Sequence, residues 1–261
     1  MSPLPDLSVV IPTYRGASRL PATLKRLRTA VMACGLSAVE VLVVDDGSPP
    51  EEQEAVHAVL ADAAGDGSHL PANLDLTVVC LTENRGQPEA TVIGVGLTRG
   101  RLVATVDDDG GHPVEELPAM VSRFTQDPGL DLLYGAPVRR QGVSVFRRLG
   151  TVCNNLLFTL FAGKPWRVPV TSFRVIRRER VQAALAVPMS YPYLSAMLFA
   201  SPPPPKVGVH RYPAPPATPS RYAPRRLLLV YWRLVLYWGP LRVLGRRLRP
   251  QRVYDVVGGC R

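Results

Sequence analysis

The chain has 261 residues, is 46% hydrophobic and carries a formal net charge of +10. This length and apolar content allow a large folded core and exclude a generally disordered chain. The four cysteines are scattered and form no CxxC pair, which argues against a disulfide framework or a zinc site and indicates a reducing compartment.

Apolar runs alternate with segments of helical spacing through the first half of the chain. The runs predict strands over 7–11, 39–44, 76–81 and 101–106, with a fifth over 130–134. The helical spacing predicts helices over 18–33, 51–60, 88–98 and 114–124. Strands that alternate with helices indicate an α/β fold, Rossmann-like, with a mostly parallel sheet flanked by helices.

The second half of the chain is less regular. A helix is predicted over 146–161, and two proline-rich stretches, 201–205 and 212–219, predict an extended connection. Residues 221–261 hold ten arginines and one acid, so they carry +9 of the net charge. We therefore expect one domain over 1–219 and a basic, amphipathic helical tail over 220–261.

Three consecutive carboxylates, Asp107, Asp108 and Asp109, directly follow the fourth predicted strand. Adjacent carboxylates repel one another, so this placement indicates a cation or strong donors nearby; the alternative is an exposed acidic turn. Polar clusters also follow the other three strands, at 12–14, 45–46 and 82–86. Because ligands bind outside the carboxyl ends of parallel strands, we expect all four clusters to face one crevice. Oxygen ligands there suit Mg²⁺ or Mn²⁺.

The strand ends carry these motifs: Leu7-Ser-Val-Val-Ile-Pro-Thr-Tyr14, Val41-Leu-Val-Val-Asp-Asp-Gly-Ser48, Leu81-Thr-Glu-Asn-Arg-Gly-Gln87 and Val106-Asp-Asp-Asp109. Weaker motifs follow: His112-Pro-Val-Glu115, Thr171-Ser-Phe-Arg174 and Ser220-Arg-Tyr222. Together they resemble family 2 glycosyltransferases of GT-A fold, in the branch that transfers sugars to polyprenyl phosphates. That branch includes dolichyl-phosphate mannose synthases and bacterial undecaprenyl-phosphate glycosyltransferases.

The resemblance implies an inverting, metal-dependent glycosyltransferase. Its donor would be a UDP-, GDP- or dTDP-sugar, and its acceptor a polyprenyl phosphate of the undecaprenyl or dolichyl type. The nucleotide-sugar half would cover about 1–112 and the acceptor half about 113–219. By the same resemblance Asp107 and Asp109 would hold Mg²⁺ or Mn²⁺, and Asp109 would also act in catalysis.

Further site residues follow from the resemblance. The residues expected to contact the nucleotide are Pro12, Tyr14, Asp45, Asp46, Asn84, Gly86, Asp107 and Asp108. A helix N-cap is the alternative role for the Asp45–Asp46 pair. Guanidinium groups suit phosphate oxygens, so Arg139, Arg148 and Arg174 are expected at the acceptor phosphate as catalytic residues, with Arg140 and Arg147 as further candidates. The alternative is that these arginines are solvated surface residues.

Two departures from the family pattern keep other functions open. Gly111 stands where the family commonly has a Gln that can join the metal, and Val168 stands near the place of a missing Asp. One alternative is the same fold acting on a soluble natural-product acceptor. Another is a catalytically weakened, membrane-associated relative that binds nucleotide.

The tail combines arginines with aromatic residues. Its longest apolar stretch, 227–238, is too short to span a bilayer and contains an arginine, but it suits a helix lying on an anionic membrane surface. The alternative is a helix packed on the protein core. Aromatic and apolar residues dominate the segment, which argues against nucleic-acid binding. With no signal peptide at the N-terminus, we expect a cytoplasmic protein, peripheral on the inner face of the membrane.

Overall fold

The fold is taken from a computed structural model, which describes residues 4–65, 73–138, 156, 158–160, 163–188, 191–213, 232 and 235–237. Within these ranges, no helix has both the length and the apolar content that crossing a membrane requires. Most of the predicted helix over 146–161 and most of the tail lie outside the described residues.

The first half of the chain has the predicted alternation of strands and helices. The strands are β1 (Leu7–Thr13), β2 (Val39–Asp45), β3 (Leu74–Cys80) and β4 (Leu102–Thr105). The helices are α1 (Leu20–Ala33), α2 (Pro50–Gly65), α3 (Gln87–Leu97), the short 3₁₀ helix η1 (Val114–Glu116) and α4 (Leu117–Gln126). Strand β1 continues through Pro12, two residues beyond the predicted end. Strand β4 pairs with β1 only over Leu7–Val10, so at Pro12 the strand has a ladder partner on one side only.

The second half extends the same sheet with elements that the sequence did not predict, apart from β5. They are β5 (Leu132–Pro137), β6 (Arg174–Arg177), α6 (Arg178–Leu185), α7 (Leu194–Ala200) and β7 (Val207–Tyr212). The sheet has the order β3-β2-β1-β4-β6-β5-β7. Strand β6 runs antiparallel to both of its neighbours, and the other pairs are parallel. The predicted α/β fold with a mostly parallel sheet is therefore confirmed.

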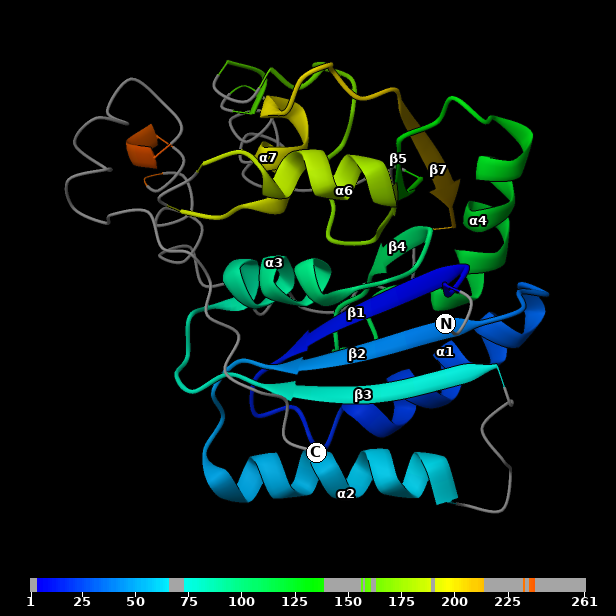
Figure 1. The fold of residues 1–261 in the computed structure, drawn as a ribbon, viewed down its shortest axis with the longest axis vertical. Helices are drawn as coiled ribbons and strands as arrows, with labels where there is room; N and C mark the ends of the chain where they lie inside the picture. The colour runs from blue at the N-terminus through cyan, green and yellow to red at the C-terminus, as the bar shows by residue number, and fades with distance from the viewer. Residues whose placement is uncertain are drawn as a thin grey trace.

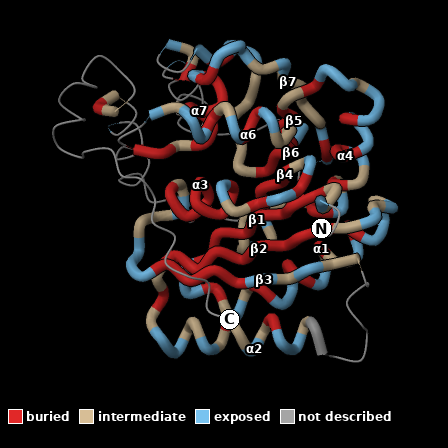
Figure 2. Tube along the Cα trace, in the orientation of Figure 1, coloured by how far each residue is buried: buried red, intermediate tan, exposed pale blue. Residues whose placement is uncertain are grey.

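Helices cover both faces of the sheet, as the ribbon shows (Figure 1). Helices α1, α2 and α4 pack on one face, where Leu27, Val56 and Met120 join one apolar cluster. Helices α3, α6 and α7 pack on the other face in a second cluster. Strands β1 and β2 are buried along their whole length, whereas α2 alternates buried and exposed residues (Figure 2). Two-sided coverage explains the continuous apolar runs in these strands.

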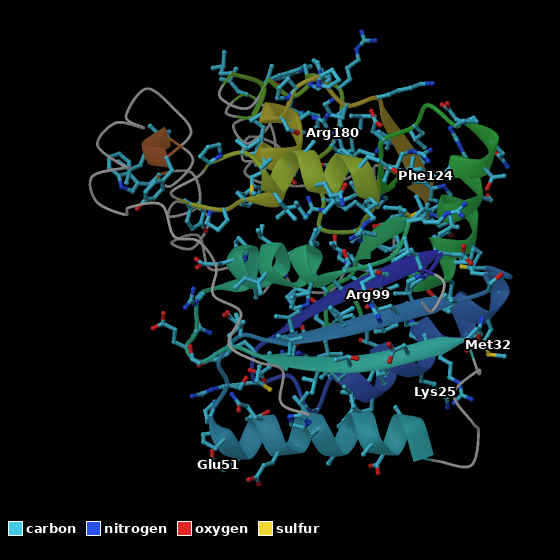
Figure 3. The ribbon with its side chains drawn as sticks, in the orientation of Figure 1. Lys25, Met32, Glu51, Arg99, Phe124 and Arg180 are labelled. Carbon is cyan, nitrogen blue, oxygen red and sulfur yellow. The ribbon has the colours of Figure 1, made fainter. Side chains whose placement is uncertain are left out.

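A hydrogen-bond network links the amino ends of the central strands. Ser8 on β1 donates to Glu40 on β2 at 2.5 Å and accepts from the Gly100 N–H at 2.8 Å. Arg99, labelled in Figure 3, donates to the same glutamate at 2.8 Å and to Asp75 on β3 at 3.2 Å. This network holds the strands in one register, so their carboxyl ends lie at fixed positions at the opposite edge of the sheet.

Candidate active site

The loop after β4 carries the three aspartates to the carboxyl edge of the sheet. The Val106 N–H still donates to β1, so the loop departs from a fixed point. Asp107 accepts a hydrogen bond at each carboxylate oxygen, from Gln87 Nε2 at Oδ1 and from Ser172 Oγ at Oδ2, both at 2.7 Å. Its orientation is therefore set by two segments far away in the sequence. Each oxygen keeps a second lone pair for a ligand.

His112 closes the loop back onto Asp107. Its Nδ1 accepts the Asp107 N–H at 3.0 Å, which puts the ring proton on Nε2. This Nε2 lies 3.4 Å from Asp107 Oδ2 and 3.3 Å from Ser172 Oγ, and the ring stacks on Phe173. Burial of the ring lowers the pKa of His112, although the nearby carboxylates act in the opposite direction. The neutral imidazole therefore helps to fix the position of Asp107.

Asp108 points back toward α1 and away from its two neighbours. Its Oδ2 accepts from Thr13 Oγ1 and from the Arg19 guanidinium, both at 2.6 Å, and its carbonyl accepts from Thr23 Oγ1 at 3.1 Å. The arginine neutralises the central charge of the triplet. This pairing explains why three consecutive carboxylates are tolerated at one strand end.

Asp109 is the exposed member of the triplet. Its Oδ1 accepts the Gly111 N–H at 2.8 Å, a local turn that fixes the side chain. Gly110 between them has a φ of +70°, a left-handed conformation that glycine adopts without strain. The carboxylate is thus exposed on the loop, and one of its oxygens is hydrogen-bonded to the backbone two residues further on.

The end of β2 holds the turn over 84–86 in place. Asp46 accepts the Arg85 N–H at Oδ1 (2.7 Å) and the Gly86 N–H at Oδ2 (2.8 Å). Burial raises the pKa of Asp46 to about 6, against the opposing effect of these two hydrogen bonds. Asp45 is completely buried; its Oδ1 accepts the Ser48 N–H, while its Oδ2 has no hydrogen-bond partner among the described residues. Asp45 therefore supports the turn over 45–48 from inside the fold.

These contacts join the strand ends into one continuous site. Asp46 binds Gly86, the next residue Gln87 binds Asp107, and Asp107 binds Ser172, which lies just before β6. Thr13 at the end of β1 binds Asp108. The polar ends of β1, β2 and β4 and the turn after β3 therefore meet at one edge of the sheet. Such a constellation of carboxylates and backbone groups can bind a cation together with an anionic ligand.

The other expected nucleotide contacts lie around this edge. Pro12 is buried within β1, and the Tyr14 ring that follows is 40% exposed. The Arg15 guanidinium lies over the Tyr14 ring, 5.5 Å from its centre. Asn84 is exposed on the turn after β3. Tyr14 and Asn84 are thus accessible to a ligand, whereas the side chain of Pro12 is buried.

Arg174 is buried within the sheet. It donates from Nε to Thr105 Oγ1 at 3.1 Å and from Nη1 to Ser195 Oγ at 2.5 Å, and its side chain is 5% exposed. These contacts tie β6 to β4 and α7, so at least part of its role is structural. The other expected phosphate-binding residues, Arg139, Arg140, Arg147 and Arg148, lie outside the described residues.

The sequence patterns gave no role to several side chains that position the loop carrying Asp107, Asp108 and Asp109, called the acidic loop below. Arg19, the N-cap of α1, and Thr23 and Arg26 in its first half all contact this loop, and Gln87 and Ser172 hold Asp107. The first three are spaced by four and three residues, which places them on one face of a helix. That polar stripe on an otherwise amphipathic helix was the available signal.

Lys164 was also missed. Its side chain is only 1% exposed, and its Nζ donates to the carbonyls of Pro165 (2.9 Å) and Val168 (2.6 Å). Burial lowers the pKa of Lys164 to about 8. The ammonium closes a turn that leaves Trp166 and Arg167 exposed at its tip. Nothing in the local sequence distinguishes this lysine from a surface one.

The donor set suits a divalent cation that shares its ligands with a substrate. Among the described side chains, no group of three or more His, Cys, Asp or Glu residues is arranged to hold a metal. Mg²⁺ is usually held through one or two carboxylates plus substrate phosphates, and Asp107 and Asp109 supply two. An apolar cavity of about 360 Å³ lies elsewhere, between α1, α2 and the β2–β3 strands, with Leu24, Val59 and Leu76 in its lining. It lacks this chemistry.

Known sequences similar to this chain are glycosyltransferases. The sequence model of the family described as "Glycosyl transferase family 2" matches residues 8–183. The chain is 35% identical over 184 residues to an undecaprenyl-phosphate 4-deoxy-4-formamido-L-arabinose transferase of Pseudomonas aeruginosa, which covers 70% of this chain and 50% of that protein. A Klebsiella pneumoniae transferase of the same name is 32% identical over 183 residues, covering 70% and 52%. The chain therefore spans about half the length of these curated relatives.

Solved structures share the fold at low sequence identity. Glucosyl-3-phosphoglycerate synthase from Mycobacterium tuberculosis, in complex with Mn²⁺, UDP and glucosyl-3-phosphoglycerate, superposes with a TM-score of 0.60 at 17% identity. The match covers 95% of this chain and 81% of that one. A mannosyltransferase from Pyrobaculum calidifontis, in complex with GDP-Man and Mn²⁺, has a TM-score of 0.53 at 16% identity, covering 95% and 75%.

Proposed function

The chain belongs to glycosyl transferase family 2, and from this membership we propose that it transfers a sugar from a nucleotide to the phosphate of a polyprenyl lipid. The transfer inverts the anomeric centre and depends on Mg²⁺ or Mn²⁺. The lipid acceptor is supported by the undecaprenyl-phosphate transferases that the chain resembles over about half of their length.

One observation carries this proposal: the chain of contacts from Asp46 through Gly86 and Gln87 to Asp107. It brings the end of β2, the start of α3 and the acidic loop together at one edge. The N-terminus of α3, beginning at Gln87, adds the positive end of a helix dipole at the same place. A diphosphate flanked by a cation and a helix N-terminus has its charge balanced on two sides.

Asp107 and Asp109 would hold the divalent ion. When bound, it acts as a Lewis acid on the leaving diphosphate. Asp109 supplies an exposed carboxylate, and Asp107 supplies lone pairs that Gln87 and Ser172 leave free. Asp108 is neutralised by Arg19, so it contributes through loop geometry more than through direct contact with the nucleotide.

The nucleoside would lie beside the turn over 84–86. The exposed ring of Tyr14 offers a stacking surface, and Asp45, which is buried beneath the turn, is expected to contribute to this subsite from below. Asp46 and Gly86 shape this subsite through their mutual hydrogen bond, and Asn84 stands exposed next to them.

Donor binding is expected to weaken as the pH falls through about 6. Asp46 must be ionised to accept both backbone N–H groups, and its pKa is raised to about 6. With that pKa the ionised fraction falls by about 10-fold between pH 7 and pH 5. We therefore expect the dissociation constant of the donor, measured by calorimetry, to rise about 10-fold over this range.

Asp46→Asn is the control for this pH dependence. The variant should bind donor weakly at every pH, because the NH₂ of its side-chain amide would face a backbone N–H, and two donors cannot hydrogen-bond to each other. Unfolding does not explain the expected loss: the folded pKa lies above that of an unfolded aspartate, so protonation of this carboxyl favours the folded state. A wild-type slope that persists in Asp46→Asn would assign it to another group.

The acceptor needs no protein base in this reaction. A phosphate monoester has a second pKa near ~6, so at neutral pH it is already an anionic nucleophile. One of its oxygens forms a bond to the anomeric carbon while the bond to the nucleoside diphosphate breaks. The neutral ring of His112, occupied with Asp107, is not required as a base. Arg139, Arg148 and Arg174 remain predicted ligands of the acceptor phosphate.

A lipid acceptor requires contact with a membrane surface, and two features support one. The turn closed by Lys164 leaves Trp166 and Arg167 exposed, an aromatic and a basic residue of the kind that favours lipid headgroups. In the tail, Trp232 is 56% exposed. Leu236 is buried and Tyr237 stacks on Tyr191, so this part of the tail packs on the protein. We propose a peripheral position on the inner face of a membrane.

A panel of radiolabelled sugar nucleotides tests the proposed function. UDP-, GDP- and dTDP-sugars are incubated with undecaprenyl phosphate and Mg²⁺ or Mn²⁺, and the organic phase is counted. Label from one donor, absent without a divalent cation, is the expected result. Label that stays in the aqueous phase on an added soluble acceptor would contradict the lipid acceptor. Label from no donor, in a protein that still binds sugar nucleotides, would contradict the transferase activity.

A further inference from the structure

Arg26 on α1 contacts the loop over 108–115 through Nε and both terminal nitrogens of its guanidinium group. Its Nη1 donates to the Gly110 carbonyl at 2.9 Å and its Nη2 to the His112 carbonyl at 3.1 Å. Its Nε and Nη2 form a bidentate pair with Glu115 at 2.7 and 2.9 Å. One side chain thus contacts three residues of the loop, 84 to 89 positions away in the sequence.

The contacts from α1 and its N-cap Arg19 fall on both sides of Asp109 and do not involve its carboxylate. Upstream, Thr23 binds the Asp108 carbonyl and Arg19 binds the Asp108 carboxylate. Downstream, Arg26 binds the Gly110 carbonyl. The backbone of Asp109 is therefore held at its two neighbours, while its side chain remains exposed.

We propose that Arg26 is a positioning residue for cation binding: it holds the 108–115 loop in the conformation that presents Asp109. Gly110 is left-handed, and glycine has more conformations to lose than any other residue. A loop with adjacent glycines at 110 and 111 would sample many arrangements unless its carbonyls were held. The planar fork holds two of these carbonyls while it also forms a bidentate pair with Glu115, a geometry that a lysine ammonium does not offer.

This inference rests on the proposed function, because it assigns the rigidity of the loop to cation binding. Gly111 offers no side-chain ligand, so the protein supplies few donors to the ion. With few ligands, affinity depends strongly on how well the remaining carboxylates are oriented before the ion arrives. Arg26 touches neither the ion nor the substrate; it acts through Asp109.

Mn²⁺ titrations followed by electron paramagnetic resonance test this role in the full chain, with and without UDP or GDP. Arg26→Met should weaken Mn²⁺ binding about 10-fold, the lower end of what loss of a supporting residue costs a metal site. Arg26→Lys, which keeps the charge but loses the fork, should fall between Arg26→Met and the wild type. Lys25→Met is the matched control: Lys25 lies on the α2 side of α1 (Figure 3), where it lines the apolar cavity. It should bind Mn²⁺ as the wild type does.

Activity then separates positioning from general damage. For Arg26→Met the Mn²⁺ concentration giving half-maximal transfer should rise about 10-fold, with kcat near the wild-type value at saturating Mn²⁺. Wild-type Mn²⁺ affinity in Arg26→Met would overturn the inference. If Arg26→Met does not fold, Arg26→Lys decides, because it keeps the charge but loses the fork that holds the Gly110 and His112 carbonyls. Wild-type Mn²⁺ affinity in Arg26→Lys would then overturn the inference.

The same data distinguish the two proposals. A wild-type protein that binds Mn²⁺ but transfers no sugar defeats the proposed function, while the comparison of Arg26→Met with Lys25→Met still decides the role of Arg26. A wild-type protein that binds no Mn²⁺, with either nucleotide, defeats both.

Discussion

Asp109→Ala is expected to lower the rate of sugar transfer by about 10³-fold, which corresponds to ~4 kcal/mol of lost transition-state stabilisation. Asp109 is the exposed carboxylate of the triplet, and its truncation removes a ligand at the leaving diphosphate. The hydrogen bond that it accepts from the Gly111 N–H lies at the surface, where water replaces it. The free energy of unfolding, measured by urea denaturation, should therefore stay within about 0.5 kcal/mol of the wild type.

Two other aspartates serve as controls for this loss. Asp108→Ala leaves Arg19 without its carboxylate, and Thr13 without its acceptor, so it should lower the free energy of unfolding by about 1–3 kcal/mol. Asp62→Ala removes an exposed carboxylate on α2 and should change neither stability nor transfer. Transfer by Asp109→Ala at more than a tenth of the wild-type rate would contradict the role given to this carboxylate.

Gly47→Ala is expected to destabilise the protein by more than about 3 kcal/mol and to abolish donor binding. Gly47 has a φ of +66°, and a Cβ there would lie 2.3 Å from the carbonyl carbon of Glu83 and 2.5 Å from the Asn84 nitrogen. Both are backbone atoms, which cannot rotate away. The turn over 84–86 would have to leave Asp46, and with it the link to Gln87 and Asp107 would break.

Gly35→Ala isolates the cost of the backbone conformation alone. Gly35 has a nearly identical φ of +62°, but a Cβ there would meet nothing within 4 Å. This variant should lose about 1–2 kcal/mol and bind donor normally. Equal destabilisation in the two variants, by urea denaturation, would show that the close approach of the two turns contributes nothing.

The two halves of the fold were not equally accessible from the sequence. In the first half, long apolar strands and amphipathic helices repeat with clear periodicity, and each predicted element is present within a few residues. Strand β6 was missed because it has only four residues, and arginines stand at both of its ends. Its place between β4 and β5 is set by pairing across long sequence separations, which no local pattern reports.

The amino-acid sequence by itself determined that polar groups follow the strands, because a buried parallel strand can change to charged residues only where it leaves the core. The tertiary structure decided what each of three identical aspartates does. Asp107 is braced by Gln87 and Ser172, Asp108 is neutralised by Arg19, and Asp109 is left exposed. These partners lie 20 to 89 positions away along the chain. Only the packing of α1, α3 and β6 around the loop brings them together.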